Sequence, residues 1–514
     1  MRYATSLALA LACACARHPA DVESPAPPQE PAAAVPMTQR VRDPVDPPPT
    51  FLDPRRRERL AAAFPAIEDY LDRAVERDHL VGLAAAIVID GEVAWSKLWG
   101  HRDPARGLPI EHDTLFGVGS ISKTVTALAI LRLRDEGRLD LDRPARTYLP
   151  ELARIAYPTA DSPEITLRHI LTHASGLPRM GDFPEYPQEP LDRAAFLATL
   201  EGLALERPPG ERRIYSNLGF QLLGPLIDDV AGVDHRIYTR DQILRPMGIE
   251  GAAWSADEVP VDRLAIGHEH GPDGTPRPRP PWRPGATDAA GGLYLSLDDL
   301  ARYAAHNLDA WPARSDPETG PLRRSTLREA HTLQRLTDLQ FRPDAGGASV
   351  QASGNGLGFG VSADCRHDYM VAHGGKTLNY RAAILMLPTR GVGVVLLTNH
   401  SSISSRVLPN DGRMVLDLLA DTGALEARQH RASDDLLAAA AELGALVGRW
   451  DPEAYARSFS DDYRDANPLH RTEATLERWR GLVGACGEPR ALEVQEPRAG
   501  AVELRCERGQ LHLE

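Results

Sequence analysis

Hydrophobic and polar positions along this chain follow two spacings, one typical of strands and one typical of helices. Two pairs of apolar runs flank short turns: 83–89 with 93–99 around Asp90-Gly91, and 382–387 with 392–398 around Pro388-Thr389-Arg390-Gly391. Paired apolar runs around a turn predict β-hairpins. Because the two hairpins stand far apart in the sequence, we predict one antiparallel sheet built from both ends of the region that contains them.

Between the hairpins, apolar residues recur at helical intervals. The first long stretch runs from Ile121 to Glu136 and stops at Gly137, a residue type that commonly ends helices. Similar spacing is found over 60–75, 167–172, 191–200, 219–230, 297–307, 323–333 and 413–420. We therefore predict an α/β, two-lobed fold over 51–425, in which helices flank the antiparallel sheet and an all-helical lobe is inserted into it.

A second, smaller unit follows a polar junction at 428–433. Helical spacing over 436–447, 452–458 and 475–483 precedes strand-like runs over 491–494, 502–506 and 511–514. This order predicts a small α+β domain over 434–514. Cys486 and Cys506 are candidates for a disulfide, whereas Cys365 has no obvious mate.

The N-terminus has the profile of a secretory signal. A short apolar run, 4–12, follows Met1-Arg2-Tyr3 and is too brief to span a bilayer as a helix. The segment Ala10-Leu11-Ala12-Cys13 resembles a bacterial lipoprotein processing site, which implies a lipid anchor at Cys13. Cys15 is a second choice, and cleavage near Ala16 without an anchor is the alternative.

This N-terminal pattern sets the expected location. We expect residues 1–16 to be a signal peptide or lipobox and residues 17–50 to be a disordered linker, because they are rich in Pro and Ala and show no apolar periodicity. The mature protein is then exported to the periplasm or cell envelope, an oxidising compartment.

Composition narrows the partners and marks one residue type as unusual. The chain has 514 residues, 42% of them hydrophobic, so it can bury a large core, and its net charge of -14 argues against binding nucleic acid. Lys and Arg together number 58, yet the lysines are only Lys97, Lys123 and Lys376. A position that keeps lysine is a candidate for a task that arginine cannot perform, namely to lose its proton and act as a base.

Lys123 follows Ser120 by three residues, in the sequence Gly119-Ser120-Ile121-Ser122-Lys123. On a helix, side chains three apart lie on one face, so the amine can reach the hydroxyl. The start of a helix also favours negative charge, which assists an alkoxide. The spacing is that of a serine nucleophile activated by lysine, although a Ser-x-x-Lys pattern alone arises easily by chance.

Two later motifs supply partners for this pair. Tyr215-Ser216-Asn217 places a phenol, which can relay a proton, beside an amide, which can orient a carbonyl. His373-Gly374-Gly375 precedes the second hairpin, and its glycines permit a close approach of backbone and substrate.

With these three motifs in this order, the region 51–425 resembles the serine β-lactamase and penicillin-binding protein superfamily. The resemblance is to the class C β-lactamase branch with its related esterases and peptidases. Supporting phrases are Gly137-Arg138-Leu139-Asp140-Leu141-Asp142, Leu171-Thr172-His173-Ala174-Ser175-Gly176-Leu177 and Ala290-Gly291-Gly292-Leu293-Tyr294. The resemblance implies that Ser120 is acylated, that Lys123 and Tyr215 share the base and acid roles, and that Asn217 orients the substrate.

For the third motif, the resemblance implies substrate binding by His373, Gly374, Gly375 and Lys376. The backbone N–H groups of Ser120 and Lys376 would form the oxyanion hole. His373 stands where the family's Lys-Thr-Gly motif has lysine. Because histidine is largely neutral at pH 7, recognition of a substrate carboxylate is weakened.

A second departure from the family pattern, and the remaining histidines, complete the expectations for the site. Asn379 replaces a glycine that is usual in the family and is followed by Tyr380, a pair that would narrow the cleft. We expect no metal and no cofactor. His169 and His173 lack the further ligands of a zinc site, and His268-Glu269-His270 is expected at the surface.

The resulting hypothesis is an exported serine hydrolase that acts on an ester or amide through an acyl-enzyme. Its substrate is a small molecule or a peptide, with an esterase, a D-amino-acid peptidase and an enzyme for β-lactam-like substrates as the options. The alternative is a non-catalytic protein that holds peptidoglycan or penicillin in the same cleft. A membrane contact is expected only through the anchor at Cys13.

Overall fold

The computed structural model describes residues 48–186, 189–344, 347–496 and 499–513. The expected signal sequence, with its anchor at Cys13, and the expected linker up to residue 47 lie outside these residues. Among the described residues, no helix is both long enough and apolar enough to cross a membrane.

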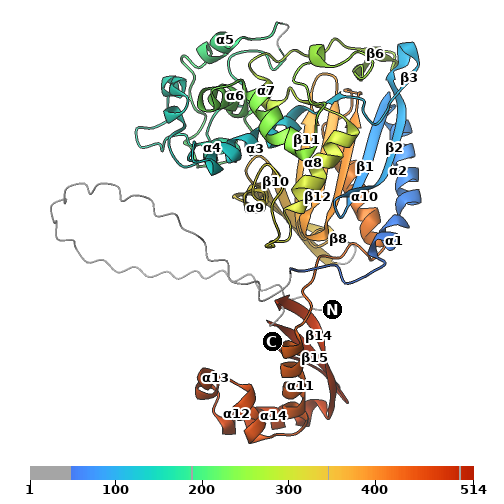
Figure 1. Cartoon of the computed structure of the whole chain (residues 1–514), viewed down its shortest axis with the longest axis vertical. Coiled ribbons are helices and arrows are strands. Elements are labelled where there is room, and N and C mark those ends of the chain that lie inside the picture. Colours follow the sequence, from blue (N-terminus) through green and yellow to red (C-terminus); the bar gives the residue numbers. More distant parts are fainter. Residues whose placement is uncertain (1–47, 187–188, 345–346, 497–498, 514) are drawn as a thin grey trace, which may run out of the picture. The chain divides into compact units, whose positions relative to one another are not determined.

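A nine-stranded antiparallel sheet forms the centre of the larger part of the chain (Figure 1). Its order is β3-β2-β1-β13-β12-β11-β10-β9-β8. The predicted hairpins are confirmed as β1 (Gly82–Ile89) with β2 (Glu92–Asp103), and β12 (Arg381–Leu387) with β13 (Val392–Thr398). The two hairpins meet where β1 pairs with β13, so both ends of the region share one sheet, as predicted.

The sheet extends further than the apolar pattern indicated. The additional strands are β3 (Leu108–Pro109), β8 (Arg335–Asp344), β9 (Gly347–Asn355), β10 (Gly360–Asp364) and β11 (Met370–Lys376). Among the side chains that are described in these strands, Leu336, Leu339 and Phe341 on the edge strand β8 are exposed, and Val361 is the one buried apolar residue of β10. These strands are therefore held mainly by the hydrogen bonds of the ladder. Prediction of a strand from sequence depends on a hydrophobic face, and these strands present a weak one.

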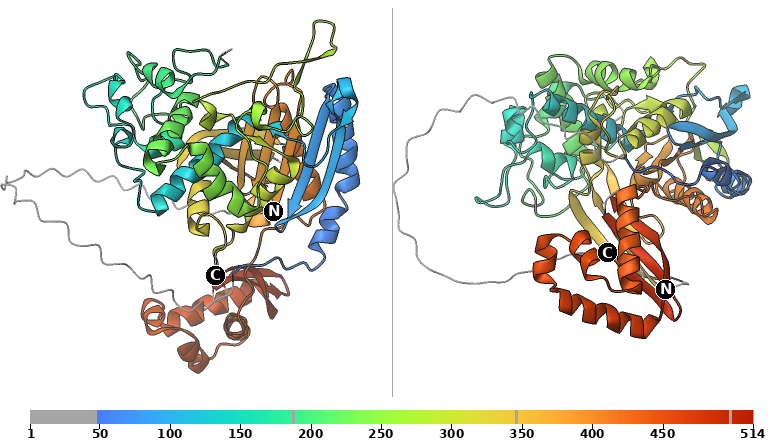
Figure 2. Two further views of the ribbon diagram at one scale, coloured as in Figure 1. Left: turned by 45° about the horizontal axis from the view of Figure 1, so that its top comes forward. Right: turned by 60° about the horizontal axis from the view of Figure 1, so that its bottom comes forward.

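Helices cover both faces of the sheet (Figure 2). Ala84, Ala86 and Val88 of β1 pack into the core that contains α3 (Ser122–Asp135) and α8 (Leu297–Asp309). The alternate β1 residues pack with α2 (Phe64–Arg77) and α10 (Val407–Asp421). Because β1 is buried on both sides, it reads as a continuous apolar run rather than an alternating one.

The single helix predicted over 60–75 is two helices in the structure. α1 (Arg56–Ala61) ends before α2, whose second residue is Pro65. Proline has no N–H to donate to the carbonyl of Ala61, so the hydrogen-bond ladder breaks there, whereas Pro65 is tolerated in the first turn of α2, where its N–H would have no helical partner.

The inserted lobe is largely helical, as predicted. It contains α4 (Leu167–Leu171), α5 (Arg193–Ala198), α6 (Asn217–Ala231) and α7 (His235–Thr239), and α9 (Arg324–His331) follows it. It is not all helical, because it also includes two short β-ribbons. These pair β4 (Phe116–Gly117) with β7 (Tyr294–Leu295), and β5 (His268–His270) with β6 (Pro276–Pro278).

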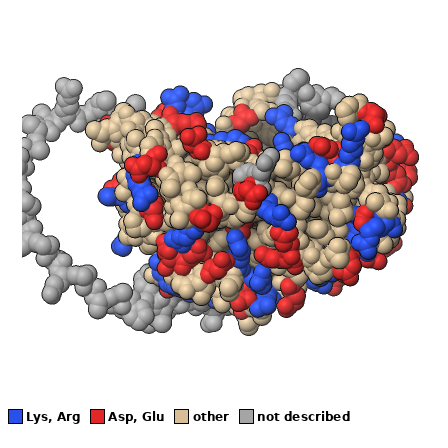
Figure 3. Space-filling view, turned by 90° about the horizontal axis from the view of Figure 1, so that it is seen from above, with Lys and Arg blue, Asp and Glu red and all other residues tan. Residues whose placement is uncertain are grey.

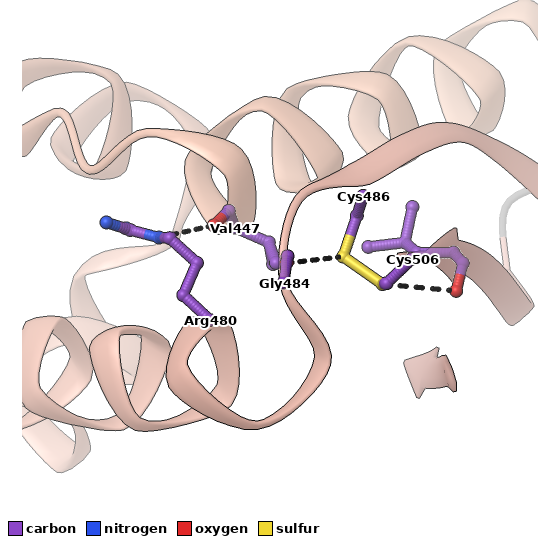
Figure 4. The surroundings of a disulfide bond; sticks show 6 residues. Val447, Arg480, Gly484, Cys486 and Cys506 are labelled. Carbon is purple, nitrogen blue, oxygen red and sulfur yellow. Dashed lines mark hydrogen bonds between the residues drawn. A yellow bond between two sulfur atoms is a disulfide. The ribbon is translucent and has the colours of Figure 1, made fainter. Parts of the chain in front are cut away.

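The C-terminal unit has its own small core around Leu446, Tyr455 and Leu504. It consists of α11 (Asp434–Gly448), α12 (Pro452–Ser458), α13 (Asp461–Ala466), α14 (Leu469–Val483), β14 (Cys486–Glu496), β15 (Ala499–Cys506) and β16 (Gly509–Leu513). The sequence reading missed α13 and began α14 at residue 475 rather than 469. The candidate disulfide is present between Cys486 and Cys506, which face each other on β14 and β15 (Figure 4).

Candidate active site

Ser120 lies in a single 3-10 turn, Gly119–Ile121, immediately before α3. The position of this turn depends on Gly119, which has a φ of +54°. A Cβ on Gly119 would come within 2.6 Å of the backbone N of Lys376, so only glycine fits there. The turn is thereby held directly against the end of β11, and this contact brings Ser120 close to the motif that begins at His373.

Lys123 reaches back from the first turn of α3 to the serine. Its Nζ lies 3.0 Å from Ser120 Oγ and 2.6 Å from the carbonyl oxygen of Ala290. The lysine is 1% exposed. Among the described residues, no carboxylate forms an ion pair with it, so the amine has only neutral acceptors.

This environment changes the proton affinity of the amine. Burial lowers the pKa of Lys123, while the Tyr215 phenol opposes the shift. Removal of an ammonium from water without a carboxylate partner favours the neutral form. A neutral amine 3.0 Å from a hydroxyl is placed to accept its proton.

The segment that carries Ala290 is fixed to α3 by side chains of the helix. Thr126 Oγ1 donates to Ala289 O at 2.7 Å, and Ser122 Oγ accepts from the N–H of Leu293 at 3.1 Å. The carbonyl that faces Lys123 therefore has a defined position. The segment Ala290 to Tyr294, one of the stretches that resemble the family, therefore contributes to the site through its backbone atoms.

Tyr215 stands beside Lys123, with its ring centroid 5.3 Å from the lysine Nζ. The guanidinium carbons of Arg179 and Arg213 lie 5.5 Å and 5.6 Å from the same ring. Positive charges thus surround the phenol.

His173 packs against Tyr215, with ring centroids 4.3 Å apart. Its Nδ1 accepts from the N–H of Ser216 at 3.2 Å, so this histidine orients the tyrosine segment. Burial and the nearby charge of Lys123 hold the pKa of His173 well below its usual range. His169, one helical turn earlier, caps the start of α4, since its Nδ1 accepts from the N–H of Thr166 at 3.3 Å.

Asn217 is the first residue of α6 and lines the same cavity as Ser120. Its Nδ2 faces Glu185 Oε1 at 3.3 Å and Met180 Sδ at 3.4 Å. Its Oδ1 is buried and has no hydrogen-bond partner.

The third motif lies on β11 and borders the cavity. Burial and the charge of Lys123 lower the pKa of His373 to about 4, and its Nδ1 lies 2.8 Å from the carbonyl of Gly374. The expected neutral histidine is therefore present. A Cβ on Gly375 would collide with the carbonyl of Val118, which explains the glycine. The side chain of Lys376 is exposed.

These residues surround a cavity of about 730 Å³. Besides the predicted positions Ser120, Tyr215, Asn217, His373, Gly374, Gly375 and Lys376, the lining includes Tyr186, Arg213, Gln221, Trp282 and Arg406. The structure thus brings the predicted site residues together, with Lys123 buried beneath them. In the face seen in Figure 3, Lys and Arg atoms border a hollow.

The predicted narrowing of the cleft by Asn379 and Tyr380 is wrong, because both side chains are buried away from the cavity lining. The Asn379 amide donates to the carbonyls of Arg279 and Pro280 at 3.2 Å and 3.0 Å. The Tyr380 hydroxyl donates to Ala265 O at 2.7 Å. The pair fastens the 265–280 segment instead.

The surface position expected for His268-Glu269-His270 is wrong for its first residue. His268 is buried, and its Nδ1 lies 2.8 Å from Ile266 O. β5 packs against the end of the central sheet, where the N–H of His268 donates to Asn399 O.

One group of possible metal ligands occurs in the described part of the chain, formed by Asp228, Asp234 and His235. The ring nitrogens of His235 face two carboxylates, Nδ1 toward Asp228 at 3.2 Å and Nε2 toward Asp288 at 2.7 Å. Although burial opposes it, these carboxylates raise the pKa of His235 to about 9. Both ring nitrogens of His235 thus face carboxylates, and the group forms a buried ion cluster in the structure.

Two known proteins are similar to this chain in sequence. Esterase EstB from Burkholderia gladioli is 28% identical over 390 residues, which cover 68% of this chain and 93% of the esterase. Beta-lactamase-like protein 2 from Dictyostelium discoideum is 30% identical over 272 residues, and the chain spans about half, 48%, of that protein's length.

Solved structures show the same fold. The octameric penicillin-binding protein homologue from Pyrococcus abyssi superposes with a TM-score of 0.60 at 26% identity, covering 71% of this chain and 79% of that one. EstCE1, a hydrolase with promiscuous acyltransferase activity, gives a TM-score of 0.57 at 20% identity, over 70% and 99% of the two chains. The Beta-lactamase family profile matches residues 67–416. This chain therefore belongs to the Beta-lactamase family.

Proposed function

We propose that this protein is a serine hydrolase that cleaves an ester or amide through an acyl-enzyme on Ser120. The observation that carries the proposal is the buried amine of Lys123, 3.0 Å from the serine hydroxyl and without a carboxylate partner among the described residues. A binding protein has no need of a lysine whose proton affinity is lowered beside a serine. Arginine, which the chain uses nearly everywhere else, would hold its proton.

The proposed reaction has two halves. In the first, Ser120 Oγ attacks the substrate carbonyl while its proton passes to the Lys123 and Tyr215 pair, and the oxyanion is held by the backbone N–H groups of Ser120 and Lys376. The carbonyl–heteroatom bond then breaks, and the leaving group takes up the proton. In the second half, water attacks the acyl-enzyme, and the acid and Ser120 are released.

The neutral His373 and the relatives favour ester substrates over β-lactams. A histidine with a pKa of about 4 carries no charge at pH 7, so it offers no cation to a β-lactam carboxylate. EstB, of which 93% is covered, is named an esterase. We therefore place ester hydrolysis first and amide, D-amino-acid peptide or β-lactam cleavage after it.

The deciding experiment is mass spectrometry of the protein after exposure to an activated ester, a chromogenic cephalosporin and a D-Ala-D-Ala peptide. We expect an acyl adduct on Ser120, with turnover greatest for the ester. Ser120→Ala should lose both adduct and turnover, while Ser404→Ala, an exposed serine outside the cavity, should keep them. Full turnover by Ser120→Ala would contradict the assignment and leave the non-catalytic binding protein for peptidoglycan or penicillin as the better hypothesis.

We further propose that the enzyme is exported and lipid-anchored at Cys13. The disulfide between Cys486 and Cys506 supports an oxidising compartment, because such bonds rarely persist in a reducing cytosol. When the protein is produced in bacteria supplied with a labelled fatty acid, the label should mark the wild type and not Cys13→Ser. Equal labelling of both would exclude the anchor at this position.

A further inference from the structure

The hairpin formed by β8 and β9 gathers apolar side chains on one of its two faces. In the register of the two strands, Leu339 pairs with Ala352 and Phe341 pairs with Val350. Side chains of residues that pair across an antiparallel ladder lie on the same face, and so do alternate side chains along one strand. These four residues therefore share one face of the hairpin.

A β-bulge brings a third residue of β8 onto the same face. The ladder shifts its register between Leu336 and Asp338, and Leu336 pairs with Gly354. Because Gly354 stands two residues after Ala352 on β9, Leu336 lies on the apolar face. Strict alternation would have placed it on the opposite face, so the bulge conceals this face from a reading of the sequence.

The apolar face is largely uncovered by the described part of the chain. Leu336 is 54% exposed, Leu339 51%, Phe341 71% and Val350 38%. Apolar residues that occur singly at a surface are ordinary, whereas a contiguous exposed row indicates a contact surface. We refer to these four residues as the hairpin face. The residues that pair on the other side are polar, namely Asp338 with Ser353 and Gln340 with Gln351.

The outer part of the hairpin projects beyond the strand next to it. β10 ends at Asp364, which pairs with Gln351 of β9. Phe341 and Val350 lie one pair further out, where the ladder of β10 no longer accompanies β9. The part of the hairpin face that contains Phe341 is therefore outside the body of the sheet.

The described chain begins at the same end of the central sheet. The ladders place the end of β10, the start of β11 and the end of β12 at the side toward which the hairpin projects. The turn after β12 lies against Phe51, because a Cβ on Gly391 would come within 3.2 Å of that ring. Figure 1 shows β8 and α1 at this end of the sheet.

This position relates the hairpin face to the predicted anchor. The predicted linker, 17–47, enters the described part of the chain at this end. A flexible linker of that length has an average end-to-end distance of about 30 Å. A chain anchored at Cys13 would therefore present this end of the sheet, and the hairpin face with it, to the bilayer.

Two features disfavour a second copy of the chain as the partner. The bulge in β8 and Pro343, which has no N–H, interrupt the edge that a strand of another copy would pair with. The net charge of -14 also makes two copies repel each other. An apolar contact with lipid requires neither a regular strand edge nor charge attraction.

We infer that the hairpin face docks on the bilayer, with Leu339 and Phe341 inserted at the boundary between headgroups and acyl chains. At this depth water still satisfies the unpaired N–H and C=O groups along the edge of β8. The contact is additional to the anchor at Cys13. The inference rests on the proposed export and anchoring, because these bring the bilayer to the protein.

The test measures binding of the full chain to vesicles of pure phosphatidylcholine by co-sedimentation. Every protein carries Cys13→Ser, so no attached lipid contributes to the comparison. We expect Leu339→Ser combined with Phe341→Ser to lower the partition coefficient by about tenfold, because two exposed apolar side chains lose their transfer out of water. Phe341→Trp should bind like the parent, because tryptophan suits the membrane interface.

Ile237→Ser combined with Val261→Ser is the matched control. These residues are 49% and 72% exposed and lie in the inserted lobe, outside the hairpin. The control should bind vesicles like the parent, and both double variants should keep the parent's Tm, which shows that they are folded. Binding should also withstand added salt, since charge attraction does not produce it.

Three results would overturn the inference. One is a parent protein that does not bind the vesicles, and another is equal binding by the hairpin variant and the parent. The third is self-association of the parent in sedimentation velocity without vesicles that the hairpin variant loses, which would make the face an interface between copies.

The fatty-acid labelling of Cys13 separates this inference from the proposed anchor. If the wild type takes up no label but binding to vesicles depends on the hairpin face, the anchor fails and the docking face stands. If Cys13 is labelled and binding does not depend on the hairpin face, only the docking face fails.

Discussion

Lys97 and Lys123 are the same residue type in two regions that treat its charge in opposite ways. On the outer side of the sheet, Lys97 of β2 lies 2.7 Å from Glu68 and 2.8 Å from Asp72 of α2. Although burial opposes it, these hydrogen bonds and charges raise the pKa of Lys97. In the cleft, Lys123 has a backbone carbonyl and a hydroxyl as acceptors, and burial lowers its pKa.

The difference shows that scarcity of lysine alone does not identify a base. Both residues survive in a chain that otherwise prefers arginine, yet only Lys123 loses proton affinity. The cause is the pairing of burial with neutral partners, which destabilises the ammonium without compensation. Lys97 has compensation and keeps its proton.

The largest expected effect comes from Lys123→Arg, which keeps a cation but removes the base. We expect kcat/KM toward an activated ester to fall at least about 100-fold, because general-base catalysis contributes about 10² to 10⁴. The wild-type profile of kcat/KM against pH should rise at a pH below the ordinary lysine pKa, in line with the lowered pKa of Lys123. Activity of Lys123→Arg within twofold of wild type would show that no proton leaves this residue.

A smaller effect is expected from Asp288, a carboxylate partner of His235 that lies close in sequence to Ala290, the backbone acceptor of Lys123. Asp288 is buried, pairs with His235 and precedes Ala290 by two residues. Asp288→Asn should lower the free energy of unfolding by about 2–4 kcal/mol at pH 6, because it leaves a buried charge with one partner fewer.

The pH dependence of this effect has a definite sign. The pKa of His235 is raised to about 9, so its stabilising contribution is complete below about 6.5 and is lost as the pH rises to about 9. Urea unfolding of wild type and Asp288→Asn should therefore differ most at pH 6 and least above pH 9. Asp229→Asn, an exposed neighbour in the same cluster, serves as the control. A constant difference across this range would mean that His235 does not carry the effect.

The smallest effect is expected at Lys97. Its side chain is 28% exposed and those of its carboxylate partners are about half exposed, so the ion pairs are screened by water. Lys97→Met should change the free energy of unfolding by less than about 1 kcal/mol and leave ester turnover unchanged. A loss of activity comparable to that of Lys123→Arg would remove the distinction between the two lysines.

Elements with a strong apolar pattern were predictable from the sequence. The hairpins β1–β2 and β12–β13 and helix α3 appear where the spacing placed them, because their burial depends on their own side chains. The strands β8 to β10 were not predictable, because their pairing depends on neighbours distant in sequence. For the same reason the buried positions of His268 and Asn379 escaped sequence reading.

The candidate site divides in the same way. Ser120, Lys123, Tyr215 and the glycines of the third motif stand in short patterns that resemble a family, so the sequence identified them. Arg179 and Arg213 stand in none of these patterns, and their positions beside the Tyr215 ring are known only from the fold. His173 belongs to a segment that resembles the family, but its contact with Tyr215 became known only from the fold.

By itself, the sequence determined which groups could react, because spacing along one helix places Lys123 beside Ser120 whatever the rest of the chain does. The tertiary structure decided the state of those groups. The burial of Lys123 against Ala290 and the contact of Gly119 with Lys376 both join segments that are more than a hundred residues apart in the sequence. Proton affinity and unsatisfied hydrogen bonds depend on desolvation, and desolvation is a property of the folded molecule.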